Sequence, residues 1–158
     1  MSKILISGYY GFANAGDEAM LTAIIESLRQ VEKNVELTVL SGNPEDTAAK
    51  HQVCSVYRFN PLGIIQAMKD SELIISGGGS LLQDVTSKRS LLYYLSIIGL
   101  GKFFGKKVML FAQGIGPIRA KWARKLTSLV CNEADLITVR DSESAAELIE
   151  MGVKPEKI

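Results

Sequence analysis

The sequence lacks most of the residues from which metal sites and histidine-dependent sites are built. It has a single histidine, His51, and two cysteines, Cys54 and Cys131, that lie far apart. These residues cannot supply a zinc site of Cys and His ligands, so we expect no metal and no cofactor. No run of 18 apolar residues occurs, which excludes a membrane-spanning helix of ordinary length. The apolar stretch at the N-terminus is too short for a signal peptide, and we expect a reduced, cytoplasmic protein.

Acidic residues are missing from one long segment. Residues 88–125 contain nine basic residues and no acid, whereas the other 120 residues contain nine basic and seventeen acidic residues. The basic residues of the segment are Lys88, Arg89, Lys102, Lys106, Lys107, Arg119, Lys121, Arg124 and Lys125. Such segregation indicates that one surface meets an anionic partner.

What the sequence does contain is the pattern of one α/β domain. Its 158 residues are 47% apolar, enough to bury ~70% of the unfolded surface without disulfides. Apolar runs predict strands at residues 3–7, 35–40, 53–57, 73–76, 108–112 and 136–139, and helical patterns predict helices at 17–31, 61–69, 87–104, 119–131 and 142–151. The strands are almost continuously apolar, as strands covered on both faces are. We therefore predict a doubly wound, mostly parallel, Rossmann-like sheet.

Unusual residues follow four of the predicted strands. Glycine-rich loops occupy residues 8–16, 77–79 and 113–117, and a polar loop begins at Arg140. Ligands of an open parallel sheet bind beyond the carboxyl ends of its strands, and these loops predict a ligand cleft there, although tight turns alone also need glycine. Neither the dinucleotide fingerprint nor the phosphate loop fits, because the glycine spacing differs in the first case and Asp17 replaces the lysine in the second.

Two charged residues of these loops are candidates for chemistry. Asp17 begins a predicted helix, so it either caps that helix or acts on a ligand. Arg140 ends a predicted buried strand, and it either binds a phosphate or carboxylate or pairs with Asp141 or Asp17. Tyr9 would stack on a sugar or pack over the sheet. His51 lies in a polar stretch and is expected at the surface rather than as a base.

Four motifs together resemble the polysaccharide pyruvyltransferase family, and more narrowly its branch that acts on bacterial secondary cell-wall polymers. They are Gly8-Tyr9-Tyr10-Gly11-x-x-Asn14-x-Gly16-Asp17-Glu18, the triple glycine at 77–79, Gln113-Gly-Ile-Gly-Pro117 and Val139-Arg140-Asp141-x-x-Ser144. The resemblance implies a two-domain enzyme similar to GT-B glycosyltransferases. Residues 1–158 would then be the amino-terminal domain, and the family's catalytic histidine would belong to a second domain. His51 does not match that histidine.

The resemblance also implies the reaction and its substrates. The pyruvyl group of phosphoenolpyruvate would be transferred to two hydroxyls of a sugar in a cell-wall or exopolysaccharide intermediate, which forms a ketal and releases phosphate. Asp17 and Arg140 would be the catalytic residues. Substrate contacts are expected from the loop residues Gly8, Tyr9, Asn14, Gly16, Gly77, Gly78, Gly79, Gln113, Gly114 and Gly116. The acceptor glycan would be carried on a lipid, and we expect no nucleic-acid partner.

Two other functions share parts of this pattern. A nucleotide-sugar glycosyltransferase would have the same architecture, and a non-catalytic module would dock an anionic polymer or lipid through residues 88–125. The glycine loops argue against a docking module, which does not need them. Within the basic segment, residues 91–100 predict either a buried crossover helix with solvated ends or a surface that contacts the inner face of the membrane. The last residues, Lys157 and Ile158, are expected to lead into a further strand.

Overall fold

A parallel sheet with helices on both faces forms the fold. The structure is a computed structural model that describes residues 2–158. The strands are β1 (Lys3–Ser7), β2 (Glu36–Ser41), β3 (Cys54–Tyr57), β4 (Leu73–Ser76), β5 (Gly79–Leu82), β6 (Lys107–Ile115) and β7 (Leu136–Val139). Their order is β3-β2-β1-β4-β6-β5, with β7 also paired to β6, and every pairing is parallel. The doubly wound parallel sheet predicted from the sequence is confirmed.

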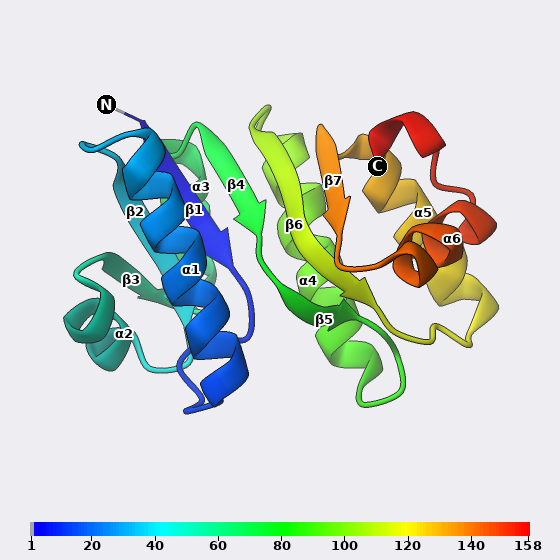
Figure 1. The fold of residues 1–158 in the computed structure, drawn as a ribbon, viewed down its shortest axis with the longest axis horizontal. Coiled ribbons are helices and arrows are strands. Elements are labelled where there is room, and N and C mark those ends of the chain that lie inside the picture. The colour runs from blue at the N-terminus through cyan, green and yellow to red at the C-terminus, as the bar shows by residue number, and fades with distance from the viewer. Residues whose placement is uncertain (1) are drawn as a thin grey trace.

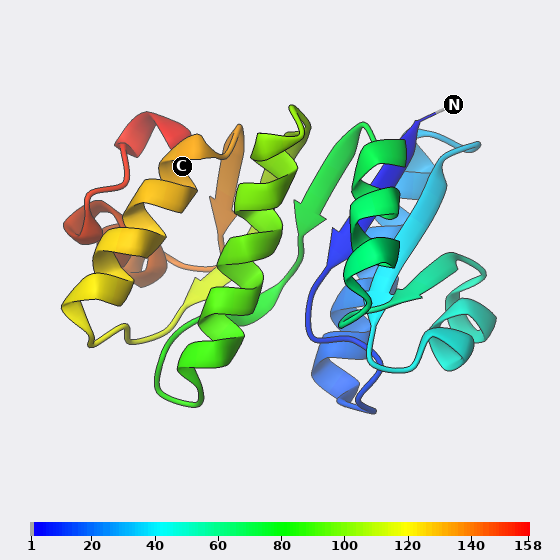
Figure 2. The ribbon, with the colours of Figure 1, turned by 180° about the vertical axis from the view of Figure 1, so that it is seen from behind.

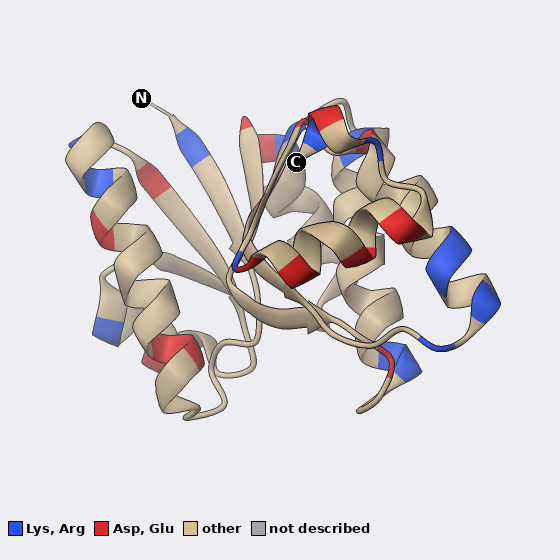
Figure 3. Ribbon diagram, turned by 45° about the vertical axis from the view of Figure 1, so that its right-hand side comes forward, with Lys and Arg blue, Asp and Glu red and all other residues tan. Residues whose placement is uncertain are grey.

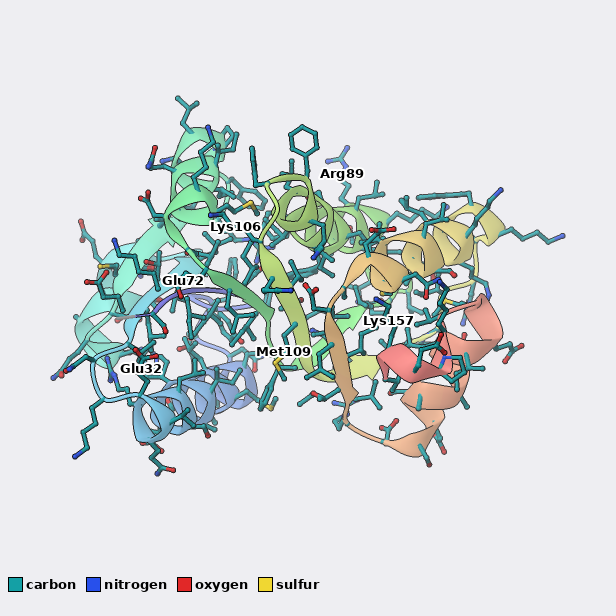
Figure 4. All side chains as sticks on the ribbon, turned by 90° about the horizontal axis from the view of Figure 1, so that it is seen from above. Glu32, Glu72, Arg89, Lys106, Met109 and Lys157 are labelled. Carbon is teal, nitrogen blue, oxygen red and sulfur yellow. The ribbon has the colours of Figure 1, made fainter. Side chains whose placement is uncertain are left out.

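Helices cover both faces of this sheet. They are α1 (Ala15–Val31), α2 (Pro44–His51), α3 (Pro61–Asp70), α4 (Lys88–Phe103), α5 (Lys121–Glu133) and α6 (Ser142–Met151). Figure 1 shows α1 and α6 in front of the strands, and Figure 2 shows α3, α4 and α5 on the other side. Figure 4 looks along the strands and shows the sheet between these two layers.

The strands are continuously apolar because each face has its own core. In β1, Ile4 and Ile6 pack with α1, whereas Leu5 belongs to the larger cluster on the other side with residues of α3 and α4. Along α4, Leu91, Leu95 and Ile98 are at most 2% exposed. Residues 91–100 therefore form a buried crossover helix, and no helix within residues 2–158 has the length and hydrophobicity to cross a membrane.

Two elements were not predicted from the sequence. Helix α2 has only Thr47 buried, so its sequence carries no apolar stripe, and it begins on Pro44 with Asn43 as its N-cap. Strand β5 was read as part of a glycine loop. Near the end of the described residues, Pro155–Lys157 forms a 3₁₀ helix.

Strands β4 and β5 run along the same side of β6. Ser76 pairs with Leu110 and Gly79 with Gln113, while β7 occupies the opposite side of β6 at Leu110 and Gln113. Residues 77–78 thus break the pairing with β6 for two residues, and β5 then continues it. This interruption places the first residues of β5 at the carboxyl edge of the sheet.

The turn at residues 77–78, between β4 and β5, packs closely against Tyr10. This residue is fully buried, and a Cβ on Gly77 would lie 2.4 Å from its hydroxyl oxygen. That hydroxyl is buried without a hydrogen-bond partner. A methyl group at residue 77 would therefore overpack the core, whereas the Tyr10 hydroxyl itself contributes little.

We expect Gly77→Ala to lower the free energy of unfolding by about 1–3 kcal/mol because of this clash. Tyr10→Phe alone is expected to change it by less than about 0.5 kcal/mol, since no hydrogen bond is lost. In the double variant the clash is relieved, so the two effects should not add. Urea unfolding of all four proteins measures the coupling, and strict additivity would contradict this account of the turn.

Candidate functional site

Four loops meet at the carboxyl edge of the sheet, which is the lower edge in Figure 1. They follow β1, β4, β6 and β7, the strands after which the sequence places its glycines and Arg140. An open cavity of about 800 Å³ lies at this edge. Its lining includes Tyr9, Asp17, Ser80, Tyr94, Gly116 and Arg119. The loops after β1 and β6 therefore line a common space with β5, and the loop after β7 reaches it only through the contact of Arg140 with Ser80.

Asp17 lines this cavity, but it is not the cap of α1. The N-cap is Asn14, whose Oδ1 accepts a hydrogen bond from the Asp17 amide at 3.1 Å. The capping interpretation of Asp17 is therefore wrong. Burial and the neighbouring carboxylate of Glu18 raise the pKa of Asp17 above its ordinary value. Gly16 is exposed in the same turn, and a Cβ there would make only ordinary contact with Asn14, so packing does not require glycine.

Arg140 lies flat against the backbone of β6. A Cβ on Gly114 would be 2.4 Å from the Arg140 guanidinium, so only glycine permits this approach. The guanidinium donates a hydrogen bond to Ser80 Oγ at 3.0 Å, and its Nε lies 3.7 Å from Asp141 Oδ2. Of the two expected ion-pair partners, Asp141 is thus the one the structure provides. The Arg140 side chain remains 54% exposed and accessible to a ligand.

Asp17 and Arg140 approach consecutive residues of β5. Gly79 adopts φ +99°, and a Cβ there would lie 3.0 Å from Asp17 Oδ1. The next residue, Ser80, holds Arg140. Asp17 and Arg140 therefore lie next to two consecutive residues of β5. Within residues 2–158 they form no ion pair with each other.

Gln113 supports this dipeptide from inside the sheet. It follows Ala112, which adopts φ +50° at an irregularity of β6 and donates its amide to Thr138 Oγ1 at 2.8 Å. The buried Gln113 side chain donates to the carbonyl oxygens of Ser76 and Gly77 at 3.0 and 3.2 Å. Its Oε1 is buried without a partner. Gln113 thus orders the turn between β4 and β5.

Three predicted glycines are needed for packing. A Cβ on Gly8 or Gly77 would lie within 2.4 Å of the Tyr10 side chain, and a Cβ on Gly78 would lie 1.7 Å from Met20 Cε. The glycines after β1 and β4 thus give room to side chains of the protein itself.

Two amides that were expected to contact a ligand already have partners. The Gly77 amide donates to the Ser7 carbonyl at 2.7 Å, and the Gly116 amide donates to the Leu82 carbonyl at 3.0 Å. A Cβ on Gly116 would also lie 2.5 Å from Gln83 Cβ. These two amides therefore stabilise the loops.

Glu18 and His51 fix the loop after β1. Glu18 Oε1 accepts the Gly11 amide at 2.9 Å, and its Oε2 lies 3.2 Å from His51 Nε2. The His51 side chain is only 9% exposed, so the expectation of a surface histidine is wrong. The sequence could not indicate this contact, because His51 belongs to the unpredicted helix α2.

The sequence analysis also missed Arg58. This residue follows β3 at the same edge of the sheet, is only 5% exposed, and lies within 6 Å of five aromatic ring centroids. A cation directly after a strand is the signal that identified Arg140, and it applied equally here. By contrast, residues 2–158 contain no group of three or more His, Cys, Asp or Glu side chains placed to hold a metal ion.

A family model described as polysaccharide pyruvyl transferase matches residues 14–158. The match covers nearly the whole chain and includes the loops after β4, β6 and β7, but it begins at the end of the loop after β1. No curated protein matches the chain significantly in sequence.

Solved structures share the fold at low sequence identity. A Listeria monocytogenes protein described as a UDP-N-acetylglucosamine 2-epimerase superposes with a TM-score of 0.59 at 10% identity, covering 99% of this chain and 44% of its own. A structure of S. aureus MnaA with UDP gives 0.55 at 16% identity, covering 99% and 42%. This chain thus spans less than half the length of these proteins, and the likeness concerns the fold alone.

The raised pKa of Asp17 gives a stability test. Its ionised form is disfavoured in the folded protein, so the cost is present at pH 7 and disappears as the pH falls below about 4, where the carboxyl is protonated in both states. We expect Asp17→Asn to raise Tm by about 1–3 °C at pH 7 and less near pH 4. Glu45→Gln removes a carboxylate from the first turn of α2, as Asp17→Asn does from the first turn of α1, so it is the matched control for loss of the favourable interaction with the helix dipole and should not raise Tm. A lower Tm for Asp17→Asn at pH 7 would contradict this assignment.

Proposed function

Because the chain belongs to the polysaccharide pyruvyl transferase family, we propose that it takes part in transfer of a pyruvyl group from phosphoenolpyruvate to a sugar. The acceptor would be a glycan intermediate of a cell-wall polymer or exopolysaccharide. The observation that carries the proposal is that Asp17, which lines the cavity, and Arg140, which donates to the cavity residue Ser80, approach the consecutive residues 79 and 80. A carboxylate and an exposed guanidinium suit a hydroxyl acceptor and an anionic donor, respectively.

The proposed reaction balances without an oxidant or reductant. Two sugar hydroxyl oxygens form bonds to C2 of the donor, and the bond from C2 to the phosphate oxygen breaks. Both hydroxyls lose their protons: one proton is added to C3, which converts the methylene into a methyl group, and the other leaves with the released phosphate. The reaction thus needs a base for a hydroxyl, an acid for C3 and cations for the donor.

Asp17 is proposed as the base for the acceptor hydroxyl. Its raised pKa makes the carboxylate a stronger proton acceptor than an ordinary aspartate. Because Asn14 caps the helix, the Asp17 carboxylate is not required for that purpose. It remains available to the cavity that it lines.

Arg140 is proposed to bind the donor. Its planar fork matches the carboxylate or the phosphate of phosphoenolpyruvate. Ser80 and Gly114 fix the guanidinium on one side, and its exposed side faces away from the β6 backbone. Such a fixed cation would bind an anion with little loss of side-chain entropy.

We propose that a second domain completes this site. The chain corresponds to 44% and 42% of the two solved structures, and one half of such an architecture supplies one wall of the cleft. The acid for C3 would come from that domain, since the described histidine, His51, is engaged by Glu18. These 158 residues alone are then expected to release no phosphate.

Phosphate release from phosphoenolpyruvate, in the protein that joins these residues to the second domain, tests the assignment. Asp17→Asn should lower kcat by about 10²–10⁴-fold without loss of Tm. Arg140→Lys should mainly raise KM for phosphoenolpyruvate, because lysine keeps the charge and loses the fork. Arg124→Lys is the control, since Arg124 does not line the cavity and pairs with Glu147. Unchanged turnover in Asp17→Asn would refute its role as base, and release of a nucleotide instead of phosphate would favour the glycosyltransferase alternative.

The basic segment does not form a single surface. Lys102 and Lys107 pair with Asp135, and Arg124 pairs with Glu147. Trp122 is 48% exposed on α5 between Lys121 and Lys125, and Lys88 Nζ at the start of α4 lies 6.0 Å from its ring, whereas Lys106 donates to the Lys69 carbonyl elsewhere. We define the Trp122 surface as Lys88, Arg89, Lys121, Trp122 and Lys125. Figure 3 shows basic residues on α5 and at the start of α4, and acidic residues along α6.

We propose that the Trp122 surface contacts an anionic membrane that carries the acceptor. The triple substitution Lys88→Gln, Lys121→Gln, Lys125→Gln should weaken co-sedimentation with phosphatidylglycerol vesicles by about 10–100-fold at low salt, since each cation contributes ~1 kcal/mol. Lys106→Gln with Lys107→Gln, which removes two cations at the opposite end of α4, should have less effect. Equal losses in both variants, or no binding at low salt, would contradict the proposed surface.

A further inference from the structure

Two aromatic rings lie stacked at the mouth of the cavity. The rings of Tyr9 and Phe12, both in the loop after β1, have centroids 4.3 Å apart and an angle of 12° between their planes. Each side chain is 41% exposed. Tyr9 lines the cavity together with Asp17. A large exposed apolar surface therefore adjoins the proposed base.

The loop beneath the stack is held in a single conformation. Gly11 adopts φ +86°, its amide donates to Glu18, and a Cβ there would lie 2.1 Å from Ser41 Oγ. A Cβ on Gly42 would lie 2.6 Å from Cζ of Phe12, so that ring lies directly on the turn after β2. Phe12 thus has the protein on one side and Tyr9 on the other. The Tyr9–Phe12 stack is therefore packed against the turn after β2.

Arg58 supports the stack from below. Its guanidinium is buried, and within residues 2–158 no carboxylate lies within ion-pair distance of it. Instead, five aromatic rings have centroids 4.5–5.8 Å from its Cζ. The five rings are those of Tyr9, Phe12, Phe59, Tyr93 and Tyr94. Cation–π attraction is therefore the main compensation for burying this charge.

This arrangement constrains the stack strongly. The Tyr93 hydroxyl donates to the Arg58 carbonyl at 2.8 Å, which ties the end of β3 to α4, and the guanidinium lies 5.8 and 5.1 Å from the rings of Tyr9 and Phe12. Displacement of the Tyr9 and Phe12 rings would remove two of the aromatic partners of the buried Arg58 guanidinium. Within residues 2–158, no carboxylate is close enough to replace them. Arg58 thus fixes the position of Tyr9 relative to Asp17.

We propose that the Tyr9–Phe12 stack is the platform on which the acceptor sugar lies, with Arg58 as its positioning residue. A sugar ring presents C–H bonds of partial positive charge to the negative face of an aromatic ring. A sugar stacked on Tyr9 would place its hydroxyls toward Asp17 in the same cavity. The inference rests on the proposed function, since it names the face that recognises the acceptor.

A nucleobase is the other ligand that stacks on aromatic rings, and the charges disfavour it. Asp17 and Glu18 both lie in the first turn of α1, directly after the loop that carries the stack, and phosphates placed close to these carboxylates would be repelled. A neutral sugar meets no such repulsion and can donate hydroxyl protons to a carboxylate. The structure therefore favours a sugar over a nucleotide on this platform.

Saturation-transfer NMR on the 158-residue chain tests the platform with methyl glycosides of N-acetylglucosamine, mannose and galactose, and with UMP. We expect transfer to the C–H protons of at least one glycoside. The signal should persist in Tyr9→Phe and fall by about five- to tenfold in Tyr9→Ala and Phe12→Ala. Phe103→Ala is the matched control, because Phe103 is 81% exposed at the far end of α4.

Arg58→Met tests the positioning role. It should lower the sugar signal while the Tyr9 side chain remains, and Arg58→Lys should restore part of it, because lysine keeps a charge for cation–π contact. If Arg58→Met does not fold, the Tyr9 and Phe12 variants still decide the proposal. Persistence of the signal in Tyr9→Ala, its loss in Phe103→Ala, or binding of UMP in place of the glycosides would overturn it.

Phosphoenolpyruvate in the same experiment separates this inference from the proposed function. Its signal should depend on Arg140 and be unchanged in Tyr9→Ala. Donor binding without any sugar signal would overturn the platform alone. A sugar signal that depends on Tyr9, without donor binding, would support the platform and count against pyruvyl transfer.

Discussion

Gln113 connects the parts of the site through one buried side chain and one carbonyl. Its amide group binds the turn between β4 and β5, and its carbonyl accepts the backbone amide of Arg140 at 3.0 Å. It pairs with Gly79 on one side and Val139 on the other. Because the residue is buried between these strands, its loss would leave several buried polar groups unpaired. The positions of Asp17 and Arg140 relative to each other therefore depend on the interior of the sheet rather than on the loops themselves.

Three charged side chains at this edge, those of Asp17, Arg140 and Arg58, have different surroundings. Asp17 is half-buried next to another carboxylate, and its raised pKa records the cost of that placement. Arg140 is half-exposed and held by a neutral hydroxyl, so its charge is available to a ligand. Arg58 is buried among aromatic rings and stabilises the loop after β1. Within residues 2–158 Asp17 pairs with no cation, and the pairing of Arg140 with Asp141 leaves the arginine side chain 54% exposed, so both charges are available to a ligand, whereas Arg58 supports the loop.

The sequence predicted the strands of the sheet and the loops at its carboxyl edge better than it predicted the contacts between side chains. Continuous apolar runs such as residues 3–7 and 73–76 gave the right strands because both faces of the sheet are covered. Strand β5 was missed because glycine at 77–79 suggested a loop, although pairing with β6 continues beyond it. The capping interpretation of Asp17, one of the two left open, is wrong because local sequence does not show which oxygen reaches the amides. The contacts of His51 and Arg58 join residues more than 30 positions apart, which no local pattern reveals.

The structure explains most of the loop glycines by packing rather than by ligand contact. Most of them clear space for a side chain of the protein: Tyr10 at Gly8 and Gly77, Met20 at Gly78, and Arg140 at Gly114. Glycine after a parallel strand is therefore explained by packing before any ligand is considered. Gly114 nevertheless differs from the others, because the side chain that it admits is a cation at the cavity edge. A glycine that brings a charged group against the backbone is a stronger indication of a site than one that admits an apolar ring, since burial alone does not favour it.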